Sequence, residues 1–291
     1  MRGMISKALC FAVSMVLATS FIGEALAQAG NVRPPQSIVK EALRLQQQKG
    51  DKDPSVTPWK QDLKLQRFLN YYYTKKPAFQ TPIMVQRLIE LGYMDQLPVQ
   101  QNYVIGFLAV VFHDNKDVLK SWLDQLDATQ YQAGAIVRAA RHAGAIDIIK
   151  QWTEEQGWTY TEEDAFDPLP MPLEEEIATP EDVERFWGAY IADGREAYLS
   201  KLFDTMLVTD VQLNQEEINK GNYETFKKRS VNEVIEGVLI NAGIQYEHVK
   251  DYLLNLASKN QNAAQNQQLQ RIIANVYATR NSLDSQKRAI Q

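Results

Sequence analysis

Histidine is the side chain best suited to acid–base and metal chemistry near neutral pH, and this chain has three: His113, His142 and His248. His113 and His142 each lie six residues after an apolar anchor, Phe107 or Ile136, so they occupy equivalent positions. In stacked helical repeats, equivalent positions lie about 8 to 10 Å apart. A zinc site there would also need nearby carboxylates: Asp114, Asp117 and Asp147. We favour the alternative that each imidazole contacts the free carbonyls at a helix C-terminus, so no metal site is predicted.

Catalytic motifs are otherwise missing from the sequence. Its only cysteine is Cys10, and it contains no G-x-S-x-G, no G-x-x-x-x-G-K and no H-E-x-x-H. A glycan-cleaving enzyme would use two carboxylates, one of them in a pocket that raises its pKa. The acids of this chain lie mainly in a proline-rich stretch and on polar helix faces. The sequence therefore predicts no catalytic residue, no cofactor and a non-enzymatic protein.

Aromatic residues are the remaining candidates for a binding site. Tyr71, Tyr72 and Tyr73 are consecutive, and three neighbouring helical residues sweep about 200° around the axis, more than a buried stripe covers. At least one ring should therefore be partly exposed. We favour two rings in the core and one on a neighbouring helix, and the alternative is contact with a peptide or glycan. The predicted binding residues are Tyr71, Tyr73, Trp158 and Tyr160.

These residues must be positioned by helices, because the apolar pattern throughout has helical spacing. In residues 102–152, apolar residues recur at i, i+1, i+4, i+5 and i+8, which is typical of a helical stripe and not of a strand. The pattern breaks at residues 113–115, near Asp127 and at residues 142–144. Two consecutive helical hairpins are predicted, and the second has a similar spacing of apolar residues to the first.

Similar hairpins are predicted before and after this pair. Their apolar anchors are spaced 39, 29, 50 and 49 residues apart: Phe68, Phe107, Ile136, Phe186 and Ile235. A strict repeat family holds its period, as tetratricopeptide units do at about 34 residues, and their W-L-G-Y pattern is not visible here. The expected fold is all-α, with degenerate helical hairpins stacked in chain order. This arrangement resembles α-solenoids in architecture, and no named family is indicated.

An acidic, proline-rich connection interrupts the hairpins. Residues 154–184 contain twelve Asp and Glu residues, no Lys or Arg, and four prolines that exclude a continuous helix. The acids do not fit the spacing of a calcium-binding loop. The stretch also carries apolar side chains: Trp158, Tyr160, Phe166, Leu169 and Leu173. We therefore expect it to fold back along the helical stack near its groove.

The C-terminal tail, residues 258–291, is polar and partly helical by prediction. A short helix is expected over residues 269–277, where Ile272, Ile273 and Val276 supply an apolar face. The tail is basic and could lie against the acidic connection, although a disordered end is the favoured interpretation.

The N-terminus has the pattern of a secretory signal peptide. Arg2 and Lys7 precede an apolar run, and Ala25-Leu26-Ala27 is an A-x-A cleavage pattern, so cleavage is expected after Ala27. The run is short for a membrane anchor, and the position of Cys10 argues against a lipoprotein. The full chain has 31 Lys and Arg against 36 Asp and Glu, net −5, and removing Arg2, Lys7 and Glu24 leaves 29 against 35, net −6. This balance gives no electrostatic case for nucleic-acid binding.

The predicted organisation has five parts: a signal peptide (1–27), N-terminal hairpins (28–153), a connection packed on the stack (154–180), C-terminal hairpins (181–257) and a tail (258–291). After cleavage, no transmembrane segment is expected, and the chain should be periplasmic or secreted. The expected function is non-enzymatic binding of a protein or peptide partner in the cell envelope. Two alternatives stay open: a glycan-active enzyme or glycan-binding module, and a secreted effector or secretion accessory. The sequence predicts no oligomeric state.

Overall fold

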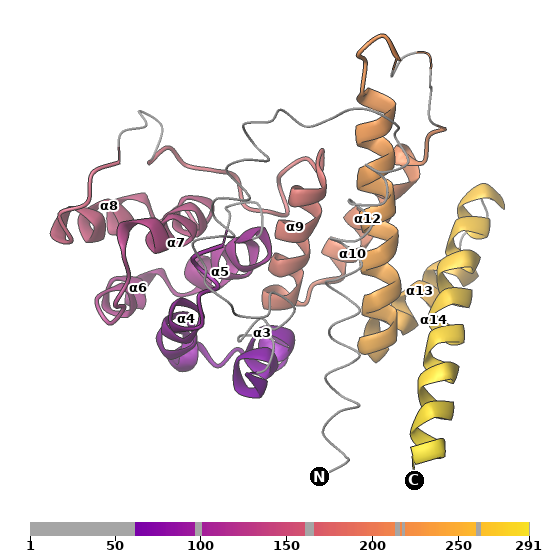
Figure 1. Ribbon diagram of the computed structural model, residues 1–291, viewed down its shortest axis with the longest axis horizontal. Coiled ribbons are helices and arrows are strands. Elements are labelled where there is room, and N and C mark those ends of the chain that lie inside the picture. Colours follow the sequence, from indigo (N-terminus) through magenta and orange to yellow (C-terminus); the bar gives the residue numbers. More distant parts are fainter. Residues whose placement is uncertain are drawn as a thin grey trace, which may run out of the picture. The chain divides into compact units, whose positions relative to one another are not determined.

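The computed structural model describes residues 62–96, 101–160, 166–212, 216, 219–259 and 263–290, and these ranges form helices and connections without a strand (Figure 1). The all-α prediction is therefore confirmed. The chain divides into two compact units, residues 1–63 and 64–291, and the architecture below is that of the second unit. The expected signal peptide lies outside the described residues.

The helices follow one another along the chain with short breaks. They are α3 (Leu63–Lys75), α4 (Thr81–Glu90), α5 (Asn102–Asp114), α6 (Lys116–Leu123), α7 (Gln130–His142), α8 (Ile146–Glu155), α9 (Pro180–Asp193), α10 (Glu196–Thr209), α12 (Glu224–Gln245), α13 (Glu247–Lys259) and α14 (Ala263–Ile290), with a 3-10 turn, η2 (Ala78–Gln80), before α4. Helix α12 continues to Gln245, and the turn before α13 comes at Tyr246.

Helices α9 and α4 begin in different ways. Thr179 caps α9, its hydroxyl accepting the Asp182 backbone N–H, and Pro180 occupies the first turn. Thr81 does not cap α4 but is its first residue. Gln80 is the cap and has helical backbone angles, because η2 leads directly into α4.

The apolar anchors lie in the core of the second unit, where each is at most 6% exposed: Phe68, Phe107, Ile136, Phe186 and Ile235. Burial of such side chains contributes roughly 1.5 to 3 kcal/mol each relative to exposure. Because the anchors come from α3, α5, α7, α9 and α12, the first helix of each hairpin supplies much of the shared core.

Chain order and spatial order differ at α9. Helix α5 packs against α7 on one side and α9 on the other, and α9 also packs against α12 (Figure 1). A stack built in chain order would place α9 on the hairpin α7–α8. The prediction of hairpins stacked in chain order is wrong at this point, and the long connection after α8 is what allows the chain to return to α5.

The crossing of α5 and α9 brings two helix backbones into contact. A Cβ on Gly106 would lie 1.7 Å from the Arg185 carbonyl oxygen, and a Cβ on Gly188 would lie 1.9 Å from the Tyr103 carbonyl oxygen. No side chain fits at either position without separating the helices. Each glycine is therefore required by the approach of the partner helix.

The C-terminal segment is a long helix, whereas a short helix over residues 269–277 was expected. Helix α14 packs on α12 and α13 and buries Leu269, Ile272, Ile273 and Val276. Arg271 forms an ion pair with Glu236 (2.6 Å), and Arg280 pairs with Glu247 (2.6 Å) and donates to the Gly243 carbonyl (3.1 Å). These basic residues thus engage the helices beside them, and their described contacts are not with the acidic connection. Among the described helices, none is long and apolar enough to cross a bilayer.

Candidate functional site: an aromatic cluster around His248

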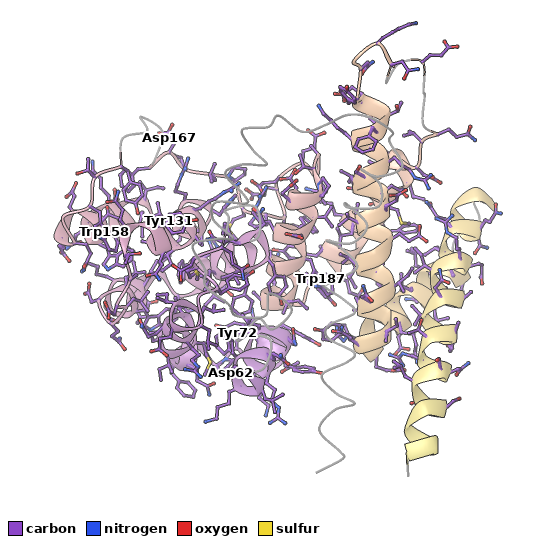
Figure 2. The ribbon with its side chains drawn as sticks, viewed as in Figure 1. Asp62, Tyr72, Tyr131, Trp158, Asp167 and Trp187 are labelled. Atoms are coloured by element: carbon purple, nitrogen blue, oxygen red, sulfur yellow. The ribbon has the colours of Figure 1, made fainter. Side chains whose placement is uncertain are left out.

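The four predicted binding residues lie in two separate groups. Trp158 packs edge-on against Trp152 with ring centroids 5.0 Å apart, and Tyr160 packs against Phe166 at 5.7 Å. Both rings are half-buried, and burial raises the pKa of Tyr160 to about 12. Trp158 lies at the α8 end of the unit, away from α3 and Trp187 (Figure 2). The structure therefore does not join Trp158 and Tyr160 to Tyr71 and Tyr73 in one site.

Tyr71 and Tyr73 face the same cluster because α3 is kinked. In a regular helix two residues separated by one position point about 200° apart, but Tyr71 has φ −128° and ψ 17°, outside the helical region. Tyr72 points into the core and is 2% exposed, Tyr73 is half-buried and Tyr71 is 50% exposed. The prediction that at least one of the three rings is exposed is confirmed, and one ring, not two, lies in the core.

Six side chains from α3, α9, the α12–α13 turn and the first turn of α13 form what we call the aromatic cluster: Tyr71, Tyr73, Trp187, Tyr190, Tyr246 and His248. Tyr71 meets Tyr246 edge-on at 6.0 Å, and Trp187 stacks on Tyr190 at 4.8 Å. Tyr73 lies 6.5 Å from Tyr190 and 5.3 Å from His248. Such ring pairs add roughly 0.5 to 1.5 kcal/mol each beyond their buried area, so the contacts between the rings stabilise the cluster.

The imidazole of His248 joins two tyrosines of the aromatic cluster. Its Nε2 lies 2.7 Å from the Tyr190 hydroxyl and its Nδ1 lies 3.3 Å from the Tyr73 hydroxyl. In a neutral imidazole one nitrogen donates and the other accepts, and a hydroxyl can take either complementary role. The ring therefore links α13 to both α3 and α9.

Gly194, the C-terminal cap of α9, makes room for Tyr73. Its φ is +83°, a left-handed conformation, and an added Cβ would lie 2.8 Å from Cδ2 of Tyr73. A side chain at this position would be strained and would also displace the ring.

Burial sets the protonation of the cluster. It raises the pKa of Tyr73, Tyr190 and Tyr246 and lowers that of His248. At neutral pH the phenols therefore keep their protons and the imidazole is neutral. The cluster offers hydroxyl groups, an imidazole and apolar ring faces, which suit recognition of a ligand or partner.

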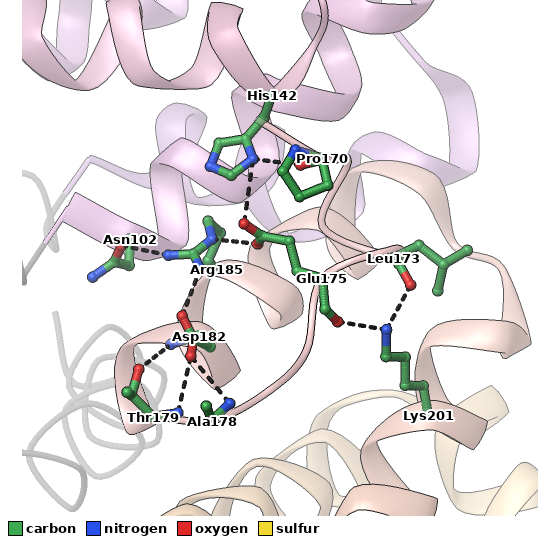
Figure 3. A network of polar contacts seen from close by, with 10 residues as sticks. All are labelled: Asn102, His142, Pro170, Leu173, Glu175, Ala178, Thr179, Asp182, Arg185 and Lys201. Atoms are coloured by element: carbon green, nitrogen blue, oxygen red, sulfur yellow. Dashed lines mark hydrogen bonds and ion pairs between the residues drawn. The ribbon is translucent and has the colours of Figure 1, made fainter. Parts of the chain in front are cut away.

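A second concentration of polar groups surrounds Arg185, whose side chain is 6% exposed. Its guanidinium pairs with Glu175 (2.8 Å) and Asp182 (2.6 Å) and donates to Asn102 (3.2 Å) (Figure 3). Burial alone would raise the pKa of Asp182, but its hydrogen bond with Thr179 and the adjacent Arg185 guanidinium lower it. Because each charge is paired, we infer that this network is structural: it holds α9 against α5 and against the segment that precedes α9.

The same network contacts the segment that precedes α9. Lys201 donates to the carbonyls of Leu173 (2.7 Å) and Glu175 (2.5 Å), and Arg141 donates to the Asp167 carbonyl (2.7 Å) (Figure 3 shows the Lys201 contacts). Ile177 is 5% exposed. Residues 167–178 are thus bonded to α7, α9 and α10.

Two histidines expected to cap their own helices contact carbonyls elsewhere. His113 and His142 do lie in the last turns of α5 and α7. However, Nδ1 of His113 lies 3.4 Å from the Ala143 carbonyl oxygen, and Nδ1 of His142 lies 2.6 Å from the Pro170 carbonyl oxygen. Each imidazole therefore joins the end of its helix to another segment. In the described residues, no group of three or more His, Cys, Asp or Glu side chains could hold a metal.

Acidification is expected to lower stability through His142. Burial lowers the pKa of its imidazole below the ordinary 6.5, so the unfolded chain binds the proton more tightly than the folded one. The stabilisation is fully present above about pH 6.5 and is lost as the pH falls through that value. The Tm measured between pH 7.5 and 5 should therefore fall more steeply for the natural chain than for His142→Asn, which keeps a donor near Nδ1.

The matched control is His113→Asn, because His113 is exposed at the end of α5. This variant should keep the pH dependence of the natural chain. If Tm fell with pH equally for the natural chain and for His142→Asn, His142 would not be the cause of the loss of stability in acid.

Four members of the aromatic cluster were not predicted as binding residues: Trp187, Tyr190, Tyr246 and His248. Trp187 and Tyr190 have the spacing of an ordinary buried stripe. Tyr246 and His248 lie more than 170 residues from Tyr71 and Tyr73 along the chain. No local pattern could have joined these positions, because the contact depends on how α3, α9 and α13 pack.

No protein family, no curated protein and no solved structure matches this chain.

Proposed function

We propose that this protein is a non-enzymatic interaction protein of the periplasm or the extracellular space, and that it binds a protein or peptide partner through the aromatic cluster. The observation that carries the proposal is Tyr71, half-exposed on a base of packed rings. Cleavage of a signal peptide after Ala27 belongs to the same proposal.

Interface energetics support this use of the cluster. Binding energy concentrates in a few large side chains, with Trp, Tyr and Arg enriched among them. A ring already fixed by its neighbours loses little conformational entropy when a partner covers it. Tyr71 meets this condition because Tyr246 holds it from one side and Tyr246 is itself 5% exposed.

The helical framework is part of the proposal. Degenerate hairpins packed through their first helices would present the cluster on a rigid support, as α-solenoids present their binding faces. The acidic, proline-rich connection would stay docked in solution through its contacts with Arg141, Arg185 and Lys201. With the connection docked on the helices, the partner would meet a binding surface that is already formed before it binds.

A glycan-binding module is the second candidate, and the same cluster favours it. A sugar ring can stack on the exposed face of Tyr71 while one of its hydroxyls bonds with the half-buried Tyr73 hydroxyl, whose oxygen can accept a further hydrogen bond. A glycan-active enzyme is the weaker form of this alternative, because the carboxylates that act on His248, those of Glu196 and Asp251, are both exposed, whereas a catalytic acid needs a pocket that raises its pKa.

Affinity capture from the cell envelope tests the proposal. The chain without residues 1–27 should retain a protein partner that Tyr71→Ala loses. Tyr131→Ala is the matched control, because Tyr131 is also exposed (56%) and lies on α7. A partner retained equally by both variants would contradict the proposed site, and retention of envelope glycan in place of protein would favour the second candidate.

A further inference from the structure

One face of α3 is basic in a chain that is acidic as a whole. Residues 64–89 contain five Lys and Arg and no Asp or Glu, whereas the full chain has 31 Lys and Arg against 36 Asp and Glu. On α3, Arg67, Tyr71 and Lys75 follow one another at intervals of four residues, about one helical turn. All three side chains are exposed, that of Tyr71 by 50%. The exposed ring therefore has one cation a turn before it and another a turn after it.

The two cations that flank Tyr71 are available to a ligand. In the described part of the chain, Arg67 and Lys75 have no ion-pair partner, and α3 itself contains no Asp or Glu. The next cation along the chain, Lys76, pairs with Asp114 at 3.2 Å. Lys64 has an interaction of its own, as has Asp62, which precedes α3. The free positive charge of this face thus belongs to Arg67 and Lys75.

Two carboxylates beside the aromatic cluster are already paired. Asp193, at the end of α9, pairs with Arg195 at 2.5 Å. Glu247, which follows Tyr246 in the chain, pairs with both Lys250 and Arg280. These carboxylates therefore do not need the cations of α3.

Two other carboxylates limit how far an anionic ligand can extend. Glu196 and Asp251 are exposed and are the charged groups that act on the imidazole of His248. That imidazole bonds to Tyr73 and Tyr190. An anionic ligand that reached His248 would be repelled by both carboxylates, so it is expected to lie along the exposed face of α3 and to end before His248.

We propose that Arg67, Tyr71 and Lys75 form a docking site for an acidic segment of a protein or peptide partner. This inference rests on the proposed function and specifies the chemistry of that partner. Arg67 and Lys75 each bind a carboxylate, and an apolar or aromatic side chain between those carboxylates packs on the Tyr71 ring. The guanidinium can hold a carboxylate through two parallel hydrogen bonds, whereas the ammonium acts as a single compact charge.

An acidic peptide fits this face better than an anionic membrane does. Side chains that hold a protein on a membrane insert into the boundary between headgroups and acyl chains. The Tyr71 ring instead packs edge-on against Tyr246, which is 5% exposed. Tyr71 thus offers a ring face that lies against the protein, which suits a partner side chain that covers it.

Titration with matched peptides tests the inference. The probes are fluorescently labelled E-E-G-F-G-E-E, K-K-G-F-G-K-K and E-E-G-G-G-E-E, and the measurement is anisotropy at low and at high salt with the chain that begins at Gln28. The first peptide should bind saturably and more weakly at high salt, since exposed charges are screened. The second should not bind. The third should bind more weakly than the first, because it lacks the ring that would cover Tyr71.

Variants assign the binding to the face of α3. Arg67→Gln combined with Lys75→Gln should weaken binding of E-E-G-F-G-E-E about tenfold at low salt, since one exposed ion pair is worth roughly two- to fivefold. Tyr71→Ala should weaken it roughly two- to tenfold, the effect of one aromatic pair. Lys150→Gln combined with Lys228→Gln is the matched control. It removes the same charge from exposed positions on α8 and α12 and should bind as the natural chain does.

Three results would overturn the inference. The first is no saturable binding of E-E-G-F-G-E-E, or equally tight binding of K-K-G-F-G-K-K. The second is an unchanged affinity in the Arg67/Lys75 variant, with circular dichroism showing that it is folded. The third is binding to vesicles of equal parts phosphatidylglycerol and phosphatidylcholine that requires Arg67 and Lys75 while the peptide does not bind, which would assign the face to an anionic membrane.

Partner capture separates this inference from the proposed function. If the acidic peptide did not bind while capture still required Tyr71, the proposed function would stand with a partner that is not acidic. If capture were also independent of Tyr71, both proposals would fail.

Discussion

Gly106→Ala and Gly188→Ala are each expected to lower the free energy of unfolding by about 3 kcal/mol or more. A Cβ at these positions would lie 1.7 or 1.9 Å from a backbone carbonyl oxygen of the facing helix. Overpacking a core usually costs about 1 to 3 kcal/mol because side chains can shift. Here the obstacle is backbone, so α5 and α9 must move apart and lose packing along their contact.

Equilibrium unfolding in urea measures this effect, and the chain contains its own controls. Gly134 in α7 and Gly237 in α12 are also helical glycines, but an added Cβ would meet nothing within 4 Å at either. Gly134→Ala and Gly237→Ala should therefore be neutral or stabilise by roughly 0.5 to 1 kcal/mol, the helix preference for alanine. A similar response at all four positions would refute the close crossing of α5 and α9.

Trp152→Ala and Trp122→Ala are each expected to cost about 3 to 5 kcal/mol, the range for truncating a buried large aromatic residue. Trp152 is fully buried (0% exposed) and Trp122 is 8% exposed. They lie on α8 and α6, which pack together, so each truncation would leave a cavity beneath the second helices of two hairpins.

Urea unfolding again provides the measurement, and Val208→Ala is the control. Val208 lies on α10 and is 72% exposed, so its truncation should change the free energy by less than about 0.5 kcal/mol. Losses of that small size at Trp152 would mean that its ring is not part of the core.

Local pattern was enough to predict the helices and their buried faces. Phe107, Ile136 and Phe186 were identified as core anchors from apolar spacing alone, and all three are buried. The reason is that helical periodicity and capping by residues such as Thr179 depend on neighbours three or four positions away. The same reasoning predicted that at least one ring among Tyr71, Tyr72 and Tyr73 is partly exposed, since that argument uses only the rotation per residue.

Helix length was predicted less well where polar residues fill the exposed face. The last helix, α14, was expected to end near Tyr277, because residues beyond it lack an apolar stripe. Its continuation includes Arg280, which bonds to Glu247 and to the Gly243 carbonyl. These partners lie on the neighbouring helices, so the stabilisation that they give to the end of α14 cannot be predicted from the sequence of α14 alone.

The order in which the helices pack was decided only in the tertiary structure. Helix α9 packs on α5 because Gly106 and Gly188 let the two backbones come into contact. A glycine in a helical sequence pattern does not indicate which other helix will pack against it. The aromatic cluster follows from that crossing, since it needs α3, α9 and α13 together and a kink at Tyr71. Periodicity determines which face of a helix is buried, but the partner of that face depends on contacts between residues far apart in the chain.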